Sequence, residues 1–211
     1  MNANIFPNSH LYETGYCVIF VREVSPMDAI SRIPYAKTDV VYLDRSELEA
    51  IKALGNEVDQ DDVPGVNIDD LESSGIMDSS GPLLRAGSHA AWTFIVEPEG
   101  PFLAKEEVLQ AVSRETSALL AQMSETAAAW ISYAQDGEIL SSFDPLFPGS
   151  DYGKQPAALE GLTGYRKAID GGERADAYEN CLRQIQKSLG CAMPTTVDAV
   201  KLPSVRVPDG Y

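Results

Sequence analysis

The sequence predicts an α+β fold in which helices pack on one face of a mostly antiparallel sheet. Three observations predict this class. Two strand-like segments, 126–135 and 138–143, are joined by Asp136-Gly137, a pair favoured in two-residue hairpin turns. Short apolar runs elsewhere are typical of strands, and amphipathic helical patterns close the chain. Because hairpin signals outweigh strict alternation of strands and helices, an antiparallel sheet is favoured over a parallel one.

The first elements are a strand and a short helix. Gly15–Arg22 is an apolar run rich in β-branched and aromatic residues, which indicates a buried strand. Ser25 can cap the helix that follows, and Pro26 suits the first helical position. We expect this helix to stop at Pro34.

A second strand and helix follow directly. Residues 39–43 read as a short strand, after which Asp44 and Glu47 have the spacing of a capping box. Gly55 is a suitable terminator for this helix.

Residues 55–81 differ in composition from the rest of the chain. The stretch between Ala53 and Leu84 contains eight acidic residues and no lysine or arginine, and it supplies half of the net charge. It also has few large apolar residues, so we expect residues 55–81 to form an exposed, flexible acidic insertion.

Structure is expected to resume at Leu83. Residues 90–96 form a predicted central strand with Trp92 on one of its faces. A short helix over 105–115 and a strand over 117–123 precede the predicted hairpin.

Two helices and an arm are expected at the end of the chain. Residues 156–169 and 173–189 show apolar positions at helical spacing, the second followed by Gly190 as terminator. Val205–Val207 lies between two prolines and reads as an edge strand or an arm on a partner. We therefore expect a single α+β domain over 1–211, with a C-terminal helix and arm at 172–211.

Charge and composition limit the functional classes. The formal net charge of the 211-residue chain is −16, which repels nucleic acid and anionic membranes and attracts a basic partner. No apolar run is long enough to cross a membrane, and the first residues lack the features of a signal peptide, so we expect a cytoplasmic protein. Three sparse cysteines do not suggest a disulfide framework or a zinc site.

No catalytic or cofactor-binding motif is recognisable, so neither a cofactor nor a metal site is expected. His10 and His89 are the two histidines, and both are interpreted as surface residues. An EF-hand pattern beginning at Asp59 fails because Val63 and Pro64 occupy key positions, although irregular calcium binding there stays open. Glu97 and Asp144, each at a strand end, are the candidate acid–base pair of an enzyme hypothesis.

Several short motifs occur in a fixed order along the chain. They are Gly15-Tyr16-Cys17, Phe20-Val21-Arg22, Ser25-Pro26, Trp92 with Glu97 and Gly100, Ser113-Arg114, Tyr133 to Gly137, Phe143-Asp144-Pro145, and Gly153 with Pro156. Together they resemble a bacterial family of uncharacterised domains. The resemblance covers about residues 11–165, skips the acidic insertion, and implies one fold unit without assigning catalytic residues.

The leading hypothesis from sequence is a non-catalytic interaction protein, of the kind represented by cytoplasmic immunity proteins and antitoxins that inhibit a basic partner. Acidic surfaces speed and orient association with such partners. The alternatives are an assembly module docking through a sheet edge or C-terminal arm, and a carboxylate-based enzyme. The expected partner-binding residues are Asp59, Asp61, Asp62, Asp69, Asp70 and Glu72.

Overall fold

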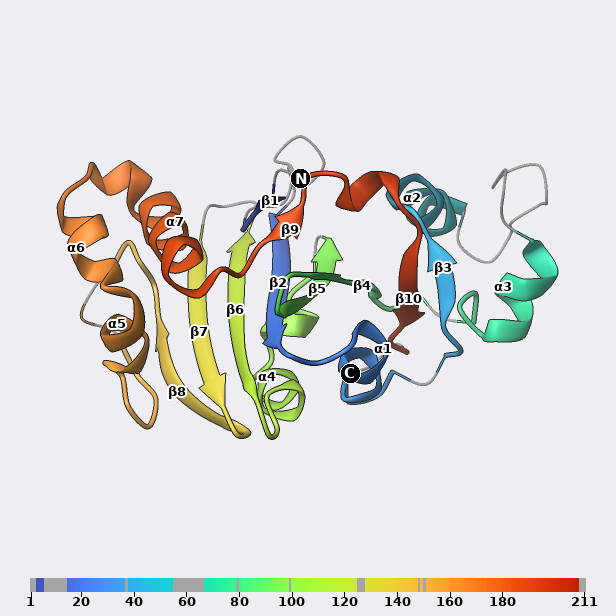
Figure 1. Ribbon diagram of the computed structural model, residues 1–211. Coiled ribbons are helices and arrows are strands. Elements are labelled where there is room, and N and C mark those ends of the chain that lie inside the picture. The colour runs from blue at the N-terminus through green and yellow to red at the C-terminus, as the bar shows by residue number, and fades with distance from the viewer. Residues whose placement is uncertain are drawn as a thin grey trace.

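An eight-stranded antiparallel sheet forms the centre of the protein (Figure 1). The computed structural model describes residues 3–5, 15–36, 38–54, 67–78, 80–98, 100–124, 128–147, 149 and 151–208. The strand order is β3-β10-β4-β5-β2-β6-β7-β8, and a separate pair, β1 and β9, lies outside this sheet. The α+β class and the antiparallel sheet expected from sequence are confirmed.

The strands within these residues are β1 (Ala3–Asn4), β2 (Gly15–Arg22), β3 (Val41–Leu43), β4 (Leu83–His89), β5 (Trp92–Pro98), β6 (Ser117–Ser124), β7 (Ala129–Gln135), β8 (Glu138–Phe143), β9 (Met193–Pro194) and β10 (Leu202–Arg206). The helices are α1 (Pro26–Ser31), α2 (Arg45–Leu54), α3 (Ile68–Ser74), α4 (Glu106–Val112), α5 (Ala158–Thr163), α6 (Tyr165–Asp170) and α7 (Ala177–Leu189). The described residues also form the short 3₁₀ turns η2 (Phe102–Ala104), η3 (Arg174–Asp176) and η4 (Val197–Ala199).

Local sequence signals set several element boundaries. The Ser25 side chain accepts a hydrogen bond from the Asp28 amide at 3.1 Å, as expected of a helix cap. Asp44 and Glu47 cap α2 reciprocally, each side chain accepting from the other residue's amide at 2.9 Å. The β7–β8 turn places Asp136 and Gly137 at positive φ, which is why this pair predicts the hairpin.

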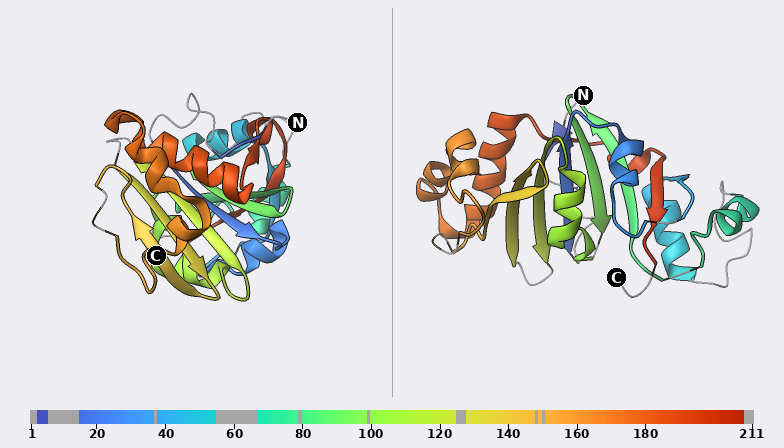
Figure 2. Two further views of the ribbon diagram at one scale, coloured as in Figure 1. Left: turned by 60° about the vertical axis from the view of Figure 1, so that its left-hand side comes forward. Right: turned by 90° about the horizontal axis from the view of Figure 1, so that it is seen from below.

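Helices cover both faces of the sheet, whereas the sequence analysis expected them on one (Figures 1 and 2). On one face, alternate β2 residues such as Val18 and Phe20 belong to an apolar cluster that α7 and the β1/β9 pair complete. On the other, α1 and α4 pack against Cys17, Ile19 and Val21. Because β2 is apolar on both sides, each side needs a covering layer.

Two further differences concern β4 and the C-terminal helices. The sequence analysis names no strand over β4, which contains Gly87; a Cβ there would lie 2.4 Å from the Phe94 ring, so the glycine makes room for that side chain. The helix expected over 156–169 is divided at Gly164, which has φ 65°.

The C-terminal strand is internal to the sheet. β10 pairs with β3 on one side and with β4 on the other, and Val205 and Val207 are buried. Interpreting 205–207 as an edge strand or partner arm is therefore wrong. Arg85 of β4 donates to the carbonyls of Val197 and Val200, at 2.8 and 3.0 Å, and so ties the segment that leads into β10 to β4.

In the described part of the chain, no helix has the length and apolar character needed to cross a membrane.

Deleting β10 tests its structural role. A chain ending at Val200 should lose cooperative unfolding or at least about 4 kcal/mol of stability, because it loses buried valines and two strand pairings. Thermal and urea unfolding measure this, with a chain ending at Pro208 as the control. A chain ending at Val200 that unfolds like the control would show that β10 is a dispensable arm.

Candidate functional site

The acidic segment contains an ordered helix. Asn67 caps α3 by accepting from the Asp69 amide at 3.0 Å, and Gly75 ends it at φ 75°. Leu71 and Ile76 are buried in a cluster with residues of α2 and β3. Part of the expected acidic insertion at 55–81 is therefore helical, and these two apolar side chains anchor residues 67–78 to the fold.

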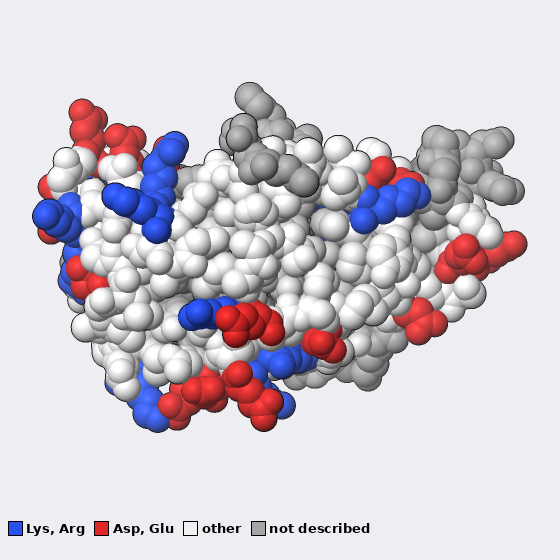
Figure 3. Space-filling model, viewed as in Figure 1, with Lys and Arg blue, Asp and Glu red and all other residues white. Residues whose placement is uncertain are grey.

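Three of the six expected partner-binding residues lie on α3. Asp69, Asp70 and Glu72 are exposed, and no described Lys or Arg forms an ion pair with them. Figure 3 shows acidic side chains at the right-hand end of the molecule, where α3 lies in the same view of Figure 1. Along the lower edge of the molecule, acidic and basic side chains are mixed. The other three, Asp59, Asp61 and Asp62, lie outside the described residues, as does the calcium hypothesis that began at Asp59.

A groove of about 500 Å³ separates α3 from β3. Asp39, Tyr42, Asp70, Ser73 and Lys201 are among the residues that line it. The Asp39 amide donates to the Ser74 carbonyl at 2.9 Å, which ties the end of α3 to the chain entering β3. The sequence did not predict this groove. The one feature of the sequence that pointed to it was the aromatic residue Tyr42 in a short strand, whose side chain is 57% exposed in the structure.

A second depression, of about 640 Å³, lies between α1, α4 and the β7–β8 turn. Arg32 and Arg114 line it together with Glu115 and Asp136, so neither charge dominates. The Arg32 guanidinium donates to the Val112 and Arg114 carbonyls at 3.2 and 2.8 Å, and it thereby caps the end of α4. The guanidinium of Arg32 therefore has a structural role here and is not available to bind a ligand.

Glu97 supports a turn. Its carboxylate is buried and accepts hydrogen bonds from the Phe102 and Leu103 amides at 3.1 and 2.7 Å. A Cβ at Gly100 would lie 1.7 Å from its Oε1, so the glycine leaves space for the carboxylate. Burial raises the Glu97 pKa, while the two amide donors oppose the rise.

Asp144 also caps a turn and is remote from Glu97. Its Oδ1 accepts from the Leu146 amide at 2.8 Å, an Asx-turn contact. Glu97 is the residue before the last of β5 and Asp144 follows β8, with β2, β6 and β7 between the two strands. Four strand spacings amount to about 19 Å, so the structure does not bring these carboxylates together.

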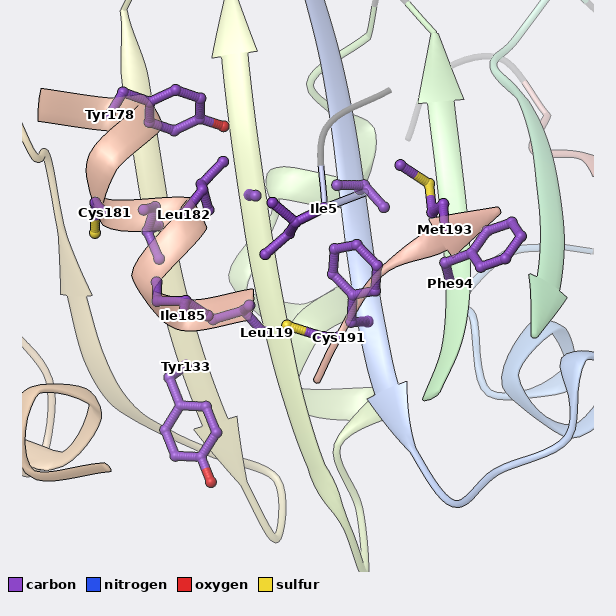
Figure 4. Close-up of a cluster of buried hydrophobic side chains, with 14 of the residues drawn as sticks. Ile5, Phe94, Leu119, Tyr133, Tyr178, Cys181, Leu182, Ile185, Cys191 and Met193 are labelled. Atoms are coloured by element: carbon purple, nitrogen blue, oxygen red, sulfur yellow. The ribbon is translucent and has the colours of Figure 1, made fainter. Parts of the chain in front are cut away.

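The remaining candidate nucleophiles and bases are dispersed. Cys17, Cys181 and Cys191 are buried, and burial raises the pKa of each thiol. Figure 4 shows Cys181 on α7 and Cys191 on the segment that follows it, both among the apolar side chains on this face of the sheet. His89 ends β4, and His10 lies outside the described residues.

Replacing Glu97 by glutamine tests its role as a turn support. Glutamine keeps one acceptor oxygen but turns an amide group toward the second backbone donor, so we expect a loss of about 1–3 kcal/mol. A carboxyl group whose pKa is raised by folding contributes stability at low pH, and that contribution is lost as the pH rises through the folded pKa. Wild type should therefore gain stability relative to Glu97→Gln between pH 7 and pH 5, as measured by urea unfolding.

The matched control is Glu107→Gln, which changes an exposed glutamate on α4. It should lower the unfolding midpoint much less than Glu97→Gln does, because it removes no buried hydrogen bond. A wild-type advantage over Glu97→Gln that is the same at pH 7 and pH 5 would contradict the raised pKa.

Comparison with known proteins identifies a family and no characterised relative. No curated protein and no solved structure matches the chain. A family model described as a family of unknown function (DUF6461) matches residues 6–176. That range includes all the motifs on which the sequence resemblance rests, and it ends just before α7. The chain belongs to this family of unknown function, DUF6461.

Proposed function

We propose that this chain is a non-catalytic interaction protein that binds a basic protein partner through its acidic end. An immunity- or antitoxin-type inhibitor acting in the cytoplasm is the role that this proposal favours. The proposed binding residues on α3 are Asp69, Asp70 and Glu72. Asp59, Asp61 and Asp62 remain part of the proposal because they precede α3 in the same acidic stretch.

The observation that carries the proposal is an acidic helix fixed to the fold by its opposite side. An isolated seven-residue helix is not stable in water, so α3 depends on the burial of Leu71 and Ile76. The exposed side of the helix then holds carboxylates without basic neighbours in ion pairs. Such an arrangement keeps its negative potential available for a partner.

The overall charge supports the same class of partner. A net charge of −16 disfavours direct binding to nucleic acid and favours rapid association with a basic protein. Because steering by exposed charges is screened by salt, complex formation should slow as ionic strength rises.

The second candidate function is an assembly module that docks through a sheet edge. The observation that favours it is the position of β3 at the end of the sheet, next to the groove. No comparable observation favours docking through residues 202–207 as a C-terminal arm, because β10 lies between β3 and β4 in the sheet.

Charge reversal on α3 tests the leading proposal. The triple variant Asp69→Lys, Asp70→Lys and Glu72→Lys should reduce capture of basic proteins from a lysate of the source organism by at least about tenfold at low salt. Affinity capture on the immobilised chain followed by mass spectrometry measures this. The same partners should dissociate from the wild-type chain as the salt concentration is raised.

A matched control carries the same change in charge elsewhere. Glu107, Asp170 and Glu173 are exposed and are distant in sequence from α3. If replacing these three by lysine reduces capture as much as the α3 variant does, net charge rather than α3 governs binding. If neither variant changes the captured proteins, the proposed function is wrong.

A further inference from the structure

β3 is an edge strand whose outward backbone groups can be assigned from its register. Tyr42 lies opposite Pro203 of β10. Because proline has no N–H, these two residues cannot form a hydrogen-bonded pair, and the bonds must instead join Val41 to Ser204 and Leu43 to Leu202. The N–H and C=O of Tyr42 therefore point away from β10, toward the outer edge.

The other edge of the sheet is already covered by the chain itself. Ser142 of β8 exchanges two backbone hydrogen bonds with Tyr152, both at 2.9 Å. The amides of Lys154 and Gln155 donate to the β8 carbonyls of Ile139 and Leu140 at 3.0 and 2.9 Å. Among the described residues, no backbone group covers Tyr42 in this way, so the two edges differ.

The groove beside β3 provides space for an added strand. β3 forms one wall and α3 forms the other, and the volume of about 500 Å³ is within the range of ligand-binding pockets. The exposed Tyr42 side chain lines this groove. A lysine or arginine opposite it could contact the ring face.

The charge of the groove selects a basic occupant. Asp39 and Asp70 line it, and Asp69 and Glu72 are exposed on the same short helix. Lys201 is the basic residue of the lining, and its ammonium lies 2.7 Å from Glu47 Oε1. Pairing of two copies of this chain through β3 would bring these carboxylates together, which the charge disfavours.

We propose that β3 binds an extended basic segment of the partner, which adds to the sheet as a further strand in the groove between β3 and α3. This inference rests on the proposed function and specifies its binding mode. Main-chain hydrogen bonds at Tyr42 hold the segment, and Asp39 and Asp70 select its Lys or Arg side chains.

The experiment uses a displayed library of random linear seven-residue peptides selected on the full chain at low salt. We expect the enriched peptides to carry Lys or Arg at alternate positions, as an added strand requires. Enriched peptides are then synthesised, and their affinities are measured by fluorescence titration.

Two substitutions at one position separate the backbone from the side chain. Tyr42→Pro removes the outward N–H without removing a bond to β10, whereas Tyr42→Ala keeps that N–H. Tyr42→Pro should weaken peptide binding at least about tenfold and Tyr42→Ala less than about threefold. N-methylation of alternate peptide residues should cause a similar loss, and this measurement does not depend on how well Tyr42→Pro folds.

The outcomes distinguish the binding mode from the function beneath it. One possible result is that basic peptides lose affinity for the α3 charge-reversal variant but still bind Tyr42→Pro and tolerate N-methylation in every register. This result would overturn strand addition and leave the proposed binding to a basic partner intact. Failure to enrich any basic peptide would overturn strand addition, and the lysate capture would then decide the proposed function alone.

Discussion

Burial of β2 on both faces is the constraint on which the rest of the structure depends. Seven of its eight residues, from Gly15 to Val21, are buried, and the strand is paired with β5 and β6 on its two edges. A central strand of this kind cannot leave either face in water. The chain therefore supplies α7 together with the β1/β9 pair for one face and α1 with α4 for the other, and the strands farther from β2 extend this layered arrangement.

The family motifs are explained largely by turn geometry. Ser25-Pro26 caps α1, Glu97 with Gly100 closes the turn into η2, and Asp144 forms an Asx turn after β8. Gly153 belongs to the same group, since a Cβ there would lie 2.5 Å from the Leu140 carbonyl oxygen. These residues occupy different places around the sheet. Their agreement with the family pattern therefore identifies the fold unit and does not by itself locate an active site.

The candidate functional features lie away from that framework, at the β3 end of the sheet. There, α2 and α3 form a small apolar cluster with β3 and β4, and α3 carries exposed carboxylates beside a strand edge that no other described strand pairs with. An exposed edge normally invites uncontrolled pairing, and like charges along it oppose self-association. The same charges favour a basic strand, which is how one surface can both resist aggregation and accept a chosen partner.

The sequence by itself determined the strands and helices whose signals are local: β2 and α1, the capping box of α2, the β7–β8 hairpin and the terminator of α7. It also located Asp69, Asp70 and Glu72 as exposed acids, because an acidic stretch without bases is visible in composition alone. The tertiary structure decided what depends on partners distant in the chain. Only packing shows that Leu71 and Ile76 order α3, that β10 lies between β3 and β4, and that Glu97 and Asp144 are four strands apart. The groove beside Tyr42 belongs to this second group, because strand order is fixed by pairing energies between segments that the linear pattern does not relate.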